Sequence, residues 1–191
     1  MKIYTKTGDS GTSGIIGGDR LSKDDAIFEA YGTLDEFNGH LGLVHSILVK
    51  ESLNDLAKII LLVQSEVFSA GSLLATPPTK RSPDTEKAHQ SIITVLEQEI
   101  DKMETELPEL KNFILPGGSL DSGFVQVARA VARRAERNII HLYLLKPDWK
   151  ISNLAPFINR LSDFLFVLAR YVNFKVGGAE NIWTNQRQER V

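Results

Sequence analysis

Long apolar stripes with helical spacing dominate this sequence. Between residues 120 and 145, apolar residues recur at intervals of three and four, as they do on one face of an α-helix that turns about 100° per residue. That face would hold Phe124, Ala128, Val131, Ala135, Ile139 and Leu142. Segments 22–50, 52–75, 83–107 and 155–172 carry stripes with the same spacing. No segment gives a convincing strand, so we expect an all-α chain.

Capping signals set the expected ends of these helices. Ser22 is the predicted N-cap of the first helix, with Asp24 and Asp25 in its first turn. Tandem prolines at 77–78 stop the second helix, and Ser82-Pro83 opens the third. Short loops between five helices predict a single domain over residues 1–191, a ferritin-like, up-and-down five-helix bundle. Residues 174–191 are polar, and we expect a mobile tail there.

Composition excludes several classes of function. The chain of 191 residues contains no cysteine, which rules out disulfides, thiolate metal sites and cysteine nucleophiles. Its four histidines lack the spacing of a metal site, so we expect no metal ligands from the protein. A net charge of −2 argues against nucleic acid as a partner. No apolar run approaches the length of a membrane span, and the N-terminus has no signal peptide, so we expect a cytoplasmic protein without a membrane partner.

The helix at 120–145 carries a concentration of arginine opposite its apolar face. Arg129, Arg133, Arg134 and Arg137 fall within nine residues that contain one acid, Glu136. Arginine suits bidentate binding of phosphate or carboxylate. A solvated surface and a binding site are both consistent with this segment alone.

Residues 1–20 differ from the rest of the chain. They are rich in glycine and hydroxyl side chains, with Lys6 among them. Glycine lets the backbone approach a ligand, and successive amides can surround phosphate oxygens. A flexible N-terminal arm is the alternative. The segment contains neither a P-loop nor a Rossmann fingerprint, so any phosphate binding uses another design.

Several further positions hold residues that a plain helical bundle does not need. Asp35 lies at the edge of the first apolar stripe, where it is either solvated or paired with a buried arginine. Phe113 opens a loop with a proline and two glycines, which is either a connection or a functional loop. The face of the last helix that is opposite its apolar stripe holds Asn159, Asp163, Phe166 and Arg170.

Together these motifs resemble the PduO-type ATP:cob(I)alamin adenosyltransferases, also called ATP:corrinoid adenosyltransferases. The resemblance spans nearly the whole chain, and its motifs occur in the family's order. They are YTKTGD at residues 4–9, SKDD at 22–25, AYGTLDE at 30–36, FILPGG at 113–118, RRAER at 133–137 and NRLSD at 159–163.

The resemblance implies a homotrimer of five-helix bundles with active sites between subunits. It also implies a set of residues that hold ATP, namely Thr5, Lys6, Thr7, Gly8, Ser13, Gly14, Lys23, Arg133, Arg134, Ala135, Glu136, Arg137 and Asn159. Asp35 and Arg129 match an ion pair of the family, and with Arg133 and Phe113 they are the implied catalytic residues. Phe113 matches the aromatic residue that displaces the lower base of the corrinoid, and Phe166 would line the same cavity.

The implied reaction transfers the 5′-deoxyadenosyl group of ATP to cob(I)alamin and releases triphosphate. Cobalt(I) is the nucleophile, so the protein needs no nucleophile of its own. The implied ligands are ATP, Mg²⁺ and cobalamin, and the implied partners are a reductase and an adenosylcobalamin-dependent enzyme. Two alternatives stay open: an ATP-binding protein that performs phosphoryl transfer, and a non-catalytic helical adaptor or cofactor chaperone.

Overall fold

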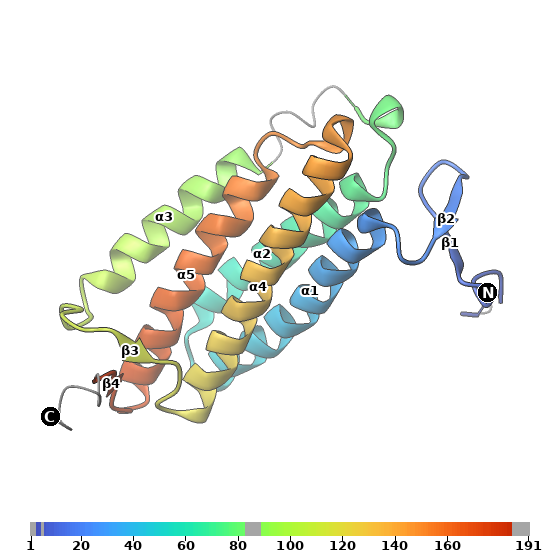
Figure 1. The fold of residues 1–191 in the computed structure, drawn as a ribbon. Coiled ribbons are helices and arrows are strands. Elements are labelled where there is room, and N and C mark those ends of the chain that lie inside the picture. Colours follow the sequence, from blue (N-terminus) through green and yellow to red (C-terminus); the bar gives the residue numbers. More distant parts are fainter. Residues whose placement is uncertain (1–2, 5, 83–88, 185–191) are drawn as a thin grey trace, which may run out of the picture.

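The computed structural model describes residues 3–4, 6–82 and 89–184. Five long helices run side by side in an elongated bundle (Figure 1). They are α1 (Ala26–Lys50), α2 (Asn54–Leu74), α3 (Gln90–Glu104), α4 (Leu120–Leu145) and α5 (Leu154–Lys175). Helix α1 packs against α2 and α4, while α5 packs against α4 and α3. The predicted five-helix bundle is confirmed.

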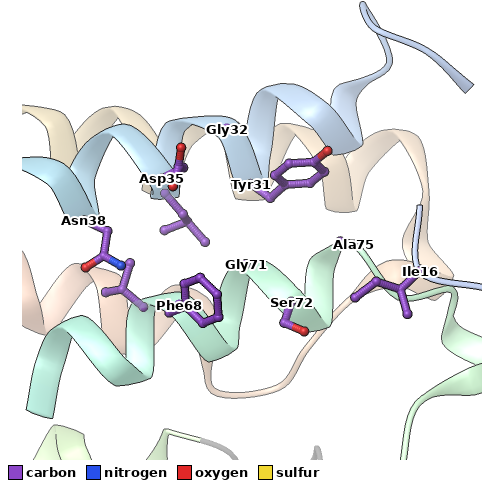
Figure 2. A pocket seen from close by; sticks show the side chains of 11 residues that line it. Ile16, Tyr31, Gly32, Asp35, Asn38, Phe68, Gly71, Ser72 and Ala75 are labelled. Atoms are coloured by element: carbon purple, nitrogen blue, oxygen red, sulfur yellow. The ribbon is translucent and has the colours of Figure 1, made fainter. Parts of the chain in front are cut away.

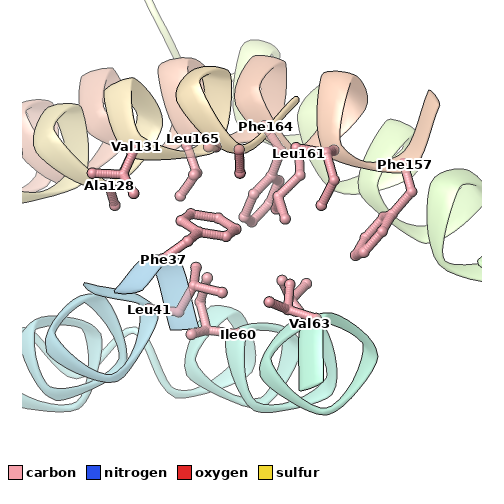
Figure 3. Packing of buried hydrophobic residues seen from close by; sticks show 14 of the residues in the cluster. Phe37, Leu41, Ile60, Val63, Ala128, Val131, Phe157, Leu161, Phe164 and Leu165 are labelled. Carbon is pink, nitrogen blue, oxygen red and sulfur yellow. The ribbon is translucent and has the colours of Figure 1, made fainter. Parts of the chain in front are cut away.

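The core forms where the apolar stripes meet. Phe37 from α1 lies among side chains of α2, α4 and α5 and is fully buried (Figure 3). Phe157 and Phe164 of α5 are also fully buried. Burial of each such side chain stabilises the fold by about 1.5–3 kcal/mol. Helix association therefore follows from the spacing of apolar residues in the sequence.

One predicted core residue of α4 was wrong. Phe124 is 37% exposed, and the buried residues near the start of this helix are Ser122, Val125 and Gln126. The buried face is therefore rotated there relative to the rest of α4. Ser122 and Gln126 line a small pocket at this end of the bundle together with Arg170 of α5.

The structure also contains short strands, which the sequence did not predict. Strands β1 (Thr12–Gly14) and β2 (Arg20–Ser22) pair antiparallel, and so do β3 (Ile114–Leu115) and β4 (Asn181–Ile182). Two or three residues are too few to show the alternation that identifies a strand. The expected mobile tail is also corrected: α5 continues to Lys175 and β4 follows, while residues 185–191 lie outside the described residues.

The first predicted helix start differs from the structure. Ser22 ends β2, and Asp25 is the N-cap of α1, where its carboxylate accepts a hydrogen bond from the Ile27 amide at 3.0 Å. Short 3-10 turns, η1 (Pro78–Lys80) and η3 (Pro147–Trp149), follow α2 and α4. The predicted start of the third helix at Pro83 lies outside the described residues, and α3 begins at Gln90.

Within the described ranges, α2 is the one helix that is long and apolar enough to cross a membrane by length and composition. Its buried residues, which include Ile60, Val63 and Val67, pack against the bundle. Core helices of soluble proteins commonly meet the same criterion.

Candidate functional site

The glycine-rich segment is a folded loop closed by an arginine. Arg20 lies on β2, and its Nη2 donates hydrogen bonds to the carbonyl oxygens of Thr7 at 2.6 Å and Thr12 at 3.0 Å. The sequence did not indicate Arg20 as a site residue, because no motif predicts its hydrogen bonds to Thr7 and Thr12 across the hairpin. The Nζ of Lys23 lies 3.4 Å from where a Cβ on Gly8 would stand. Lys23 and the glycine loop are thus neighbours, as a phosphate-binding loop requires.

Contacts with the bundle fix the position of this hairpin. The Ile16 amide donates to the Ala75 carbonyl at the end of α2 at 2.8 Å. The Tyr31 side chain on α1 hydrogen-bonds with Ser13, and burial raises the pKa of its phenol. The hairpin projects from the N-terminal end of α1 (Figure 1). Lys6 has a φ of 60° in this loop, and Thr5 lies outside the described residues.

A second group of predicted residues lies where α4 and α5 pack together. Arg133 and Arg137 are exposed on α4. Between them Glu136 accepts a hydrogen bond from the Asn159 side chain on α5 at 3.1 Å. This arrangement leaves two guanidinium groups for an anion beside a fixed amide and carboxylate. We call these four residues the arginine face.

Two neighbours in the predicted ATP-binding run lie elsewhere. Ala135 is fully buried in the core, so its side chain has no access to a ligand. Arg134 forms an ion pair with Glu36 and so connects α4 to α1, on the side of α4 away from Asn159. The helical period explains both positions, since each residue is rotated about 100° from the one before it.

Arg129 lies between the arginine face and an aromatic pocket. Its Nε donates to Gln126 at 2.7 Å, and its Cζ is 6.0 Å from the centre of the Phe166 ring. Burial lowers the pKa of this guanidinium, and nearby Arg133 lowers it further. Arginine still remains charged under all ordinary conditions. The Arg129 guanidinium is therefore partly desolvated, which strengthens its attraction to a negatively charged group.

The aromatic pocket brings Phe113 and Phe166 together. It has a volume of about 600 Å³ and is also lined by Leu110, Lys111, Asn112, Ile114 and Trp183. Phe113 is 81% exposed, a large apolar side chain left in solvent. Trp183 meets it edge-on, with ring centroids 6.4 Å apart. Trp183 was not predicted as a site residue, since residues 174–191 were expected to form a tail. An aromatic side chain within that polar stretch was the one feature that could have indicated a packed or binding position.

The expected ion pair between Asp35 and Arg129 does not form within one chain. No salt bridge among the described residues joins them. Asp35 is exposed beside a pocket of about 370 Å³ between α1 and α2, near Tyr31 and Phe68 (Figure 2). The described residues likewise show no hydrogen bond from Lys6 or Lys23 to the arginine face. The predicted site residues thus form separate groups on one subunit.

The described part of the chain offers no cluster of three His, Asp or Glu side chains for a metal ion. Proteins commonly hold Mg²⁺ through one or two carboxylates plus substrate phosphates. A magnesium ion at this site would therefore take most of its ligands from the phosphates of its nucleotide and from water.

These features define a class: a helical-bundle protein with a glycine-rich N-terminal hairpin, an arginine face and an adjoining aromatic pocket. The chain belongs to the cobalamin adenosyltransferase family, whose model matches residues 3–172.

The sequence is similar to named relatives over most of its length. A corrinoid adenosyltransferase of Bacillus subtilis is 40% identical over 178 residues, which cover 93% of this chain and 89% of that protein. The human corrinoid adenosyltransferase is 42% identical over 190 residues, covering 95% of this chain and 73% of that protein. A phenylalanine-to-histidine variant of the PduO-type ATP:corrinoid adenosyltransferase from Lactobacillus reuteri, complexed with cobalamin and ATP, superposes with a TM-score of 0.85. Its sequence identity is 34%, with 96% of this chain and 97% of that chain covered.

Proposed function

We propose that this protein transfers the 5′-deoxyadenosyl group of ATP to cob(I)alamin, forming adenosylcobalamin and triphosphate. Membership of the family supports this reaction, as do the related structures that contain cobalamin and ATP. One local observation carries it: Arg129 contacts Phe166, so the arginine face and the aromatic pocket are contiguous. ATP with its phosphates on the arginine face and a corrinoid in the aromatic pocket would therefore bring the ribose C5′ and the cobalt near each other.

In the reaction, the electron pair of cobalt(I) forms a bond to the ribose C5′ of ATP. The C5′–O bond breaks, and triphosphate leaves with the electron pair of that C–O bond. Arg133 and Arg137 bind the triphosphate and stabilise its growing charge, which is usually the largest contribution to catalysis. Magnesium bound to the phosphates would neutralise part of the same charge.

Phe113 and Phe166 provide the apolar wall of the corrinoid site. By excluding water they limit protonation of cobalt(I), a side reaction that would compete with attack on C5′. Phe113 occupies the position of the lower base and keeps the corrinoid base-off. Loss of the axial nitrogen ligand eases the reduction of cobalt(II) to cobalt(I).

A second copy of the chain completes this site. Asp35 is exposed, and among the described residues Arg129 has no carboxylate partner, so both are available across an interface. Lys6 and Lys23 of one subunit would close over a nucleotide held on the arginine face of its neighbour. The family resemblance implies a homotrimer, which would contain three such intersubunit sites. A reductase that supplies cobalt(I) and an adenosylcobalamin-dependent enzyme are its partners, in the cytoplasm.

An anaerobic assay tests the function. Chemically reduced cobalamin and ATP are mixed with the protein, and absorbance follows formation of a light-sensitive cobalt–carbon bond. Adenosyl transfer releases intact triphosphate. Release of ADP would indicate phosphoryl transfer instead, and binding of both ligands without turnover would indicate an adaptor or chaperone.

A further inference from the structure

A buried arginine at the end of α5 ties two distant segments together. Arg170 is only 4% exposed, and its Nε donates to the Glu180 carboxylate at 2.6 Å. Its Nη2 donates to the Pro108 carbonyl at 2.8 Å. Pro108 lies in the loop that leads to Phe113, whereas Glu180 lies just before β4. Arg170 therefore tethers the two segments that lead into β3 and β4.

Asn173, one turn further along α5, makes a matching pair of bonds. Its Oδ1 accepts from the Ser119 amide at 2.7 Å, and its Nδ2 donates to the Gly178 carbonyl at 3.0 Å. A Cβ added to Gly118 or Gly178 would stand 2.4 Å or 2.2 Å from Asn173 Oδ1. Both chain segments thus approach Asn173 so closely that only glycine fits.

These tethers fix the position of Trp183. Strand β4 pairs with β3 through Ile182 opposite Ile114, at the end of the bundle (Figure 1). The Trp183 amide then donates to the Phe113 carbonyl at 2.8 Å. The two rings meet edge-on at an interplanar angle of 84°, the favoured geometry for an aromatic pair.

We propose that Trp183 is a positioning residue that holds Phe113 in the orientation needed to displace the lower base of the corrinoid. This inference rests on the proposed function. Phe113 is largely in solvent, so few other side chains restrict its rotation. Contact with Trp183 reduces the conformational freedom that Phe113 must lose when a corrinoid binds. Glu180, through Arg170, acts indirectly by holding the segment that carries Trp183.

The test compares two corrinoids, because only one of them has a lower base to displace. Cobalamin carries the base and cobinamide lacks it. In Trp183→Ala, we expect adenosylation of cobalamin to fall about tenfold, while that of cobinamide stays within about threefold of wild type. Electron paramagnetic resonance of cob(II)alamin with ATP should show a smaller base-off fraction. Trp183→Phe, which keeps an aromatic edge, should restore most of the loss.

Two further variants sharpen the comparison. Glu180→Ala breaks the tether to Arg170 and should reproduce the selective loss on cobalamin. Ile182→Ala is the matched control: Ile182 is the adjacent residue on β4, is 56% exposed and does not line the pocket. It should leave the ratio of the two activities unchanged.

Each outcome has a distinct meaning. Wild-type protein that adenosylates neither corrinoid contradicts the proposed function itself. If the wild type is active but Trp183→Ala reduces both activities equally or neither, the positioning role is overturned and the proposed function stands.

Discussion

The Asn159 side chain donates a hydrogen bond to Glu136 at 3.1 Å and so joins α5 to α4 between two exposed arginines, Arg133 and Arg137. This contact holds the two helices in register where the phosphates of ATP are expected to bind. It gives the arginine face a fixed shape, because an amide and a carboxylate orient each other. Substitutions on this face should therefore separate effects on activity from effects on stability.

Arg133→Ala should lower kcat/KM by about 100-fold or more, since it removes a cation that binds the departing triphosphate. The free energy of unfolding should change by less than about 0.5 kcal/mol, because this side chain is exposed and forms no ion pair among the described residues. Steady-state kinetics and urea denaturation measure the two effects. Lys58→Ala, another exposed cation, is the control and should keep full activity. Full activity in Arg133→Ala would remove this residue from the mechanism.

Arg20→Ala should raise the KM for ATP by about tenfold with a smaller effect on kcat. Its guanidinium closes the glycine loop through Thr7 and Thr12, and without it the loop must be ordered when the nucleotide binds. The bundle should unfold at an unchanged temperature, because Arg20 contacts only the loop. Kinetics at varied ATP concentration, together with thermal denaturation, check both expectations. An unchanged KM would show that the loop does not contact ATP.

Gly178→Ala should destabilise the fold by about 1–3 kcal/mol, as expected when a well-packed site receives an extra methyl group. The new Cβ would collide with Asn173, which would lose its bonds to Ser119 and to residue 178. Chemical denaturation measures this loss. Gly39→Ala on α1 is a suitable control, since no atom lies within 4 Å of its added Cβ. Equal stability of the two variants would show that the Asn173 contact is loose.

His89 should make stability depend on pH. Its imidazole is buried on the Phe157 ring, with Glu66 as the charged group that faces it at 3.0 Å. Burial lowers the pKa of His89 below its ordinary value of 6.5, and Glu66 only partly opposes this. The unfolded state then binds more protons near that pH. The contribution of neutral His89 to the free energy of unfolding is complete above pH 6.5. It is lost as the pH falls below 6.5, at up to about 1.4 kcal/mol per pH unit.

Urea denaturation between pH 7.5 and 5.5 measures this dependence. His89→Asn removes the titrating group and keeps a residue that tolerates the left-handed φ of 66° found there. In this variant, the free energy of unfolding should fall less steeply as the pH drops below about 6.5. An identical slope in both proteins would assign the effect to other groups.

Asp35 and Arg129 should pair between subunits. Asp35→Arg would place two cations together at the interface, so the protein should dissociate and lose activity. The double variant Asp35→Arg/Arg129→Asp restores opposite charges and should recover at least part of the assembly. Light scattering after size-exclusion chromatography measures the mass. Normal assembly of the Asp35→Arg variant would place this carboxylate outside the interface.

Sequence periodicity predicted the helices well but not the strands or the tail. The stripes of α1, α2 and α5 fall largely on buried residues because long helices repeat the same contact every turn. The prediction was wrong for Arg170, which was placed on the face of α5 opposite the stripe but is buried, where it bonds to Glu180 and Pro108. The β3–β4 pair joins segments nearly seventy residues apart along the chain, at Ile114 and Ile182. No local pattern encodes a contact of that kind. Trp183 was missed for the same reason.

The sequence by itself determined the number of helices, their apolar faces and the residue types of a nucleotide- and corrinoid-binding protein. Those properties depend on local spacing and side-chain chemistry. Only the tertiary structure decided which of these residues meet. It grouped Arg133, Glu136 and Asn159, turned Arg134 toward α1, buried Ala135 and separated Asp35 from Arg129. The reason is geometric: the packing of helices against each other sets which face of each helix is buried, which meets a neighbouring helix and which stays exposed.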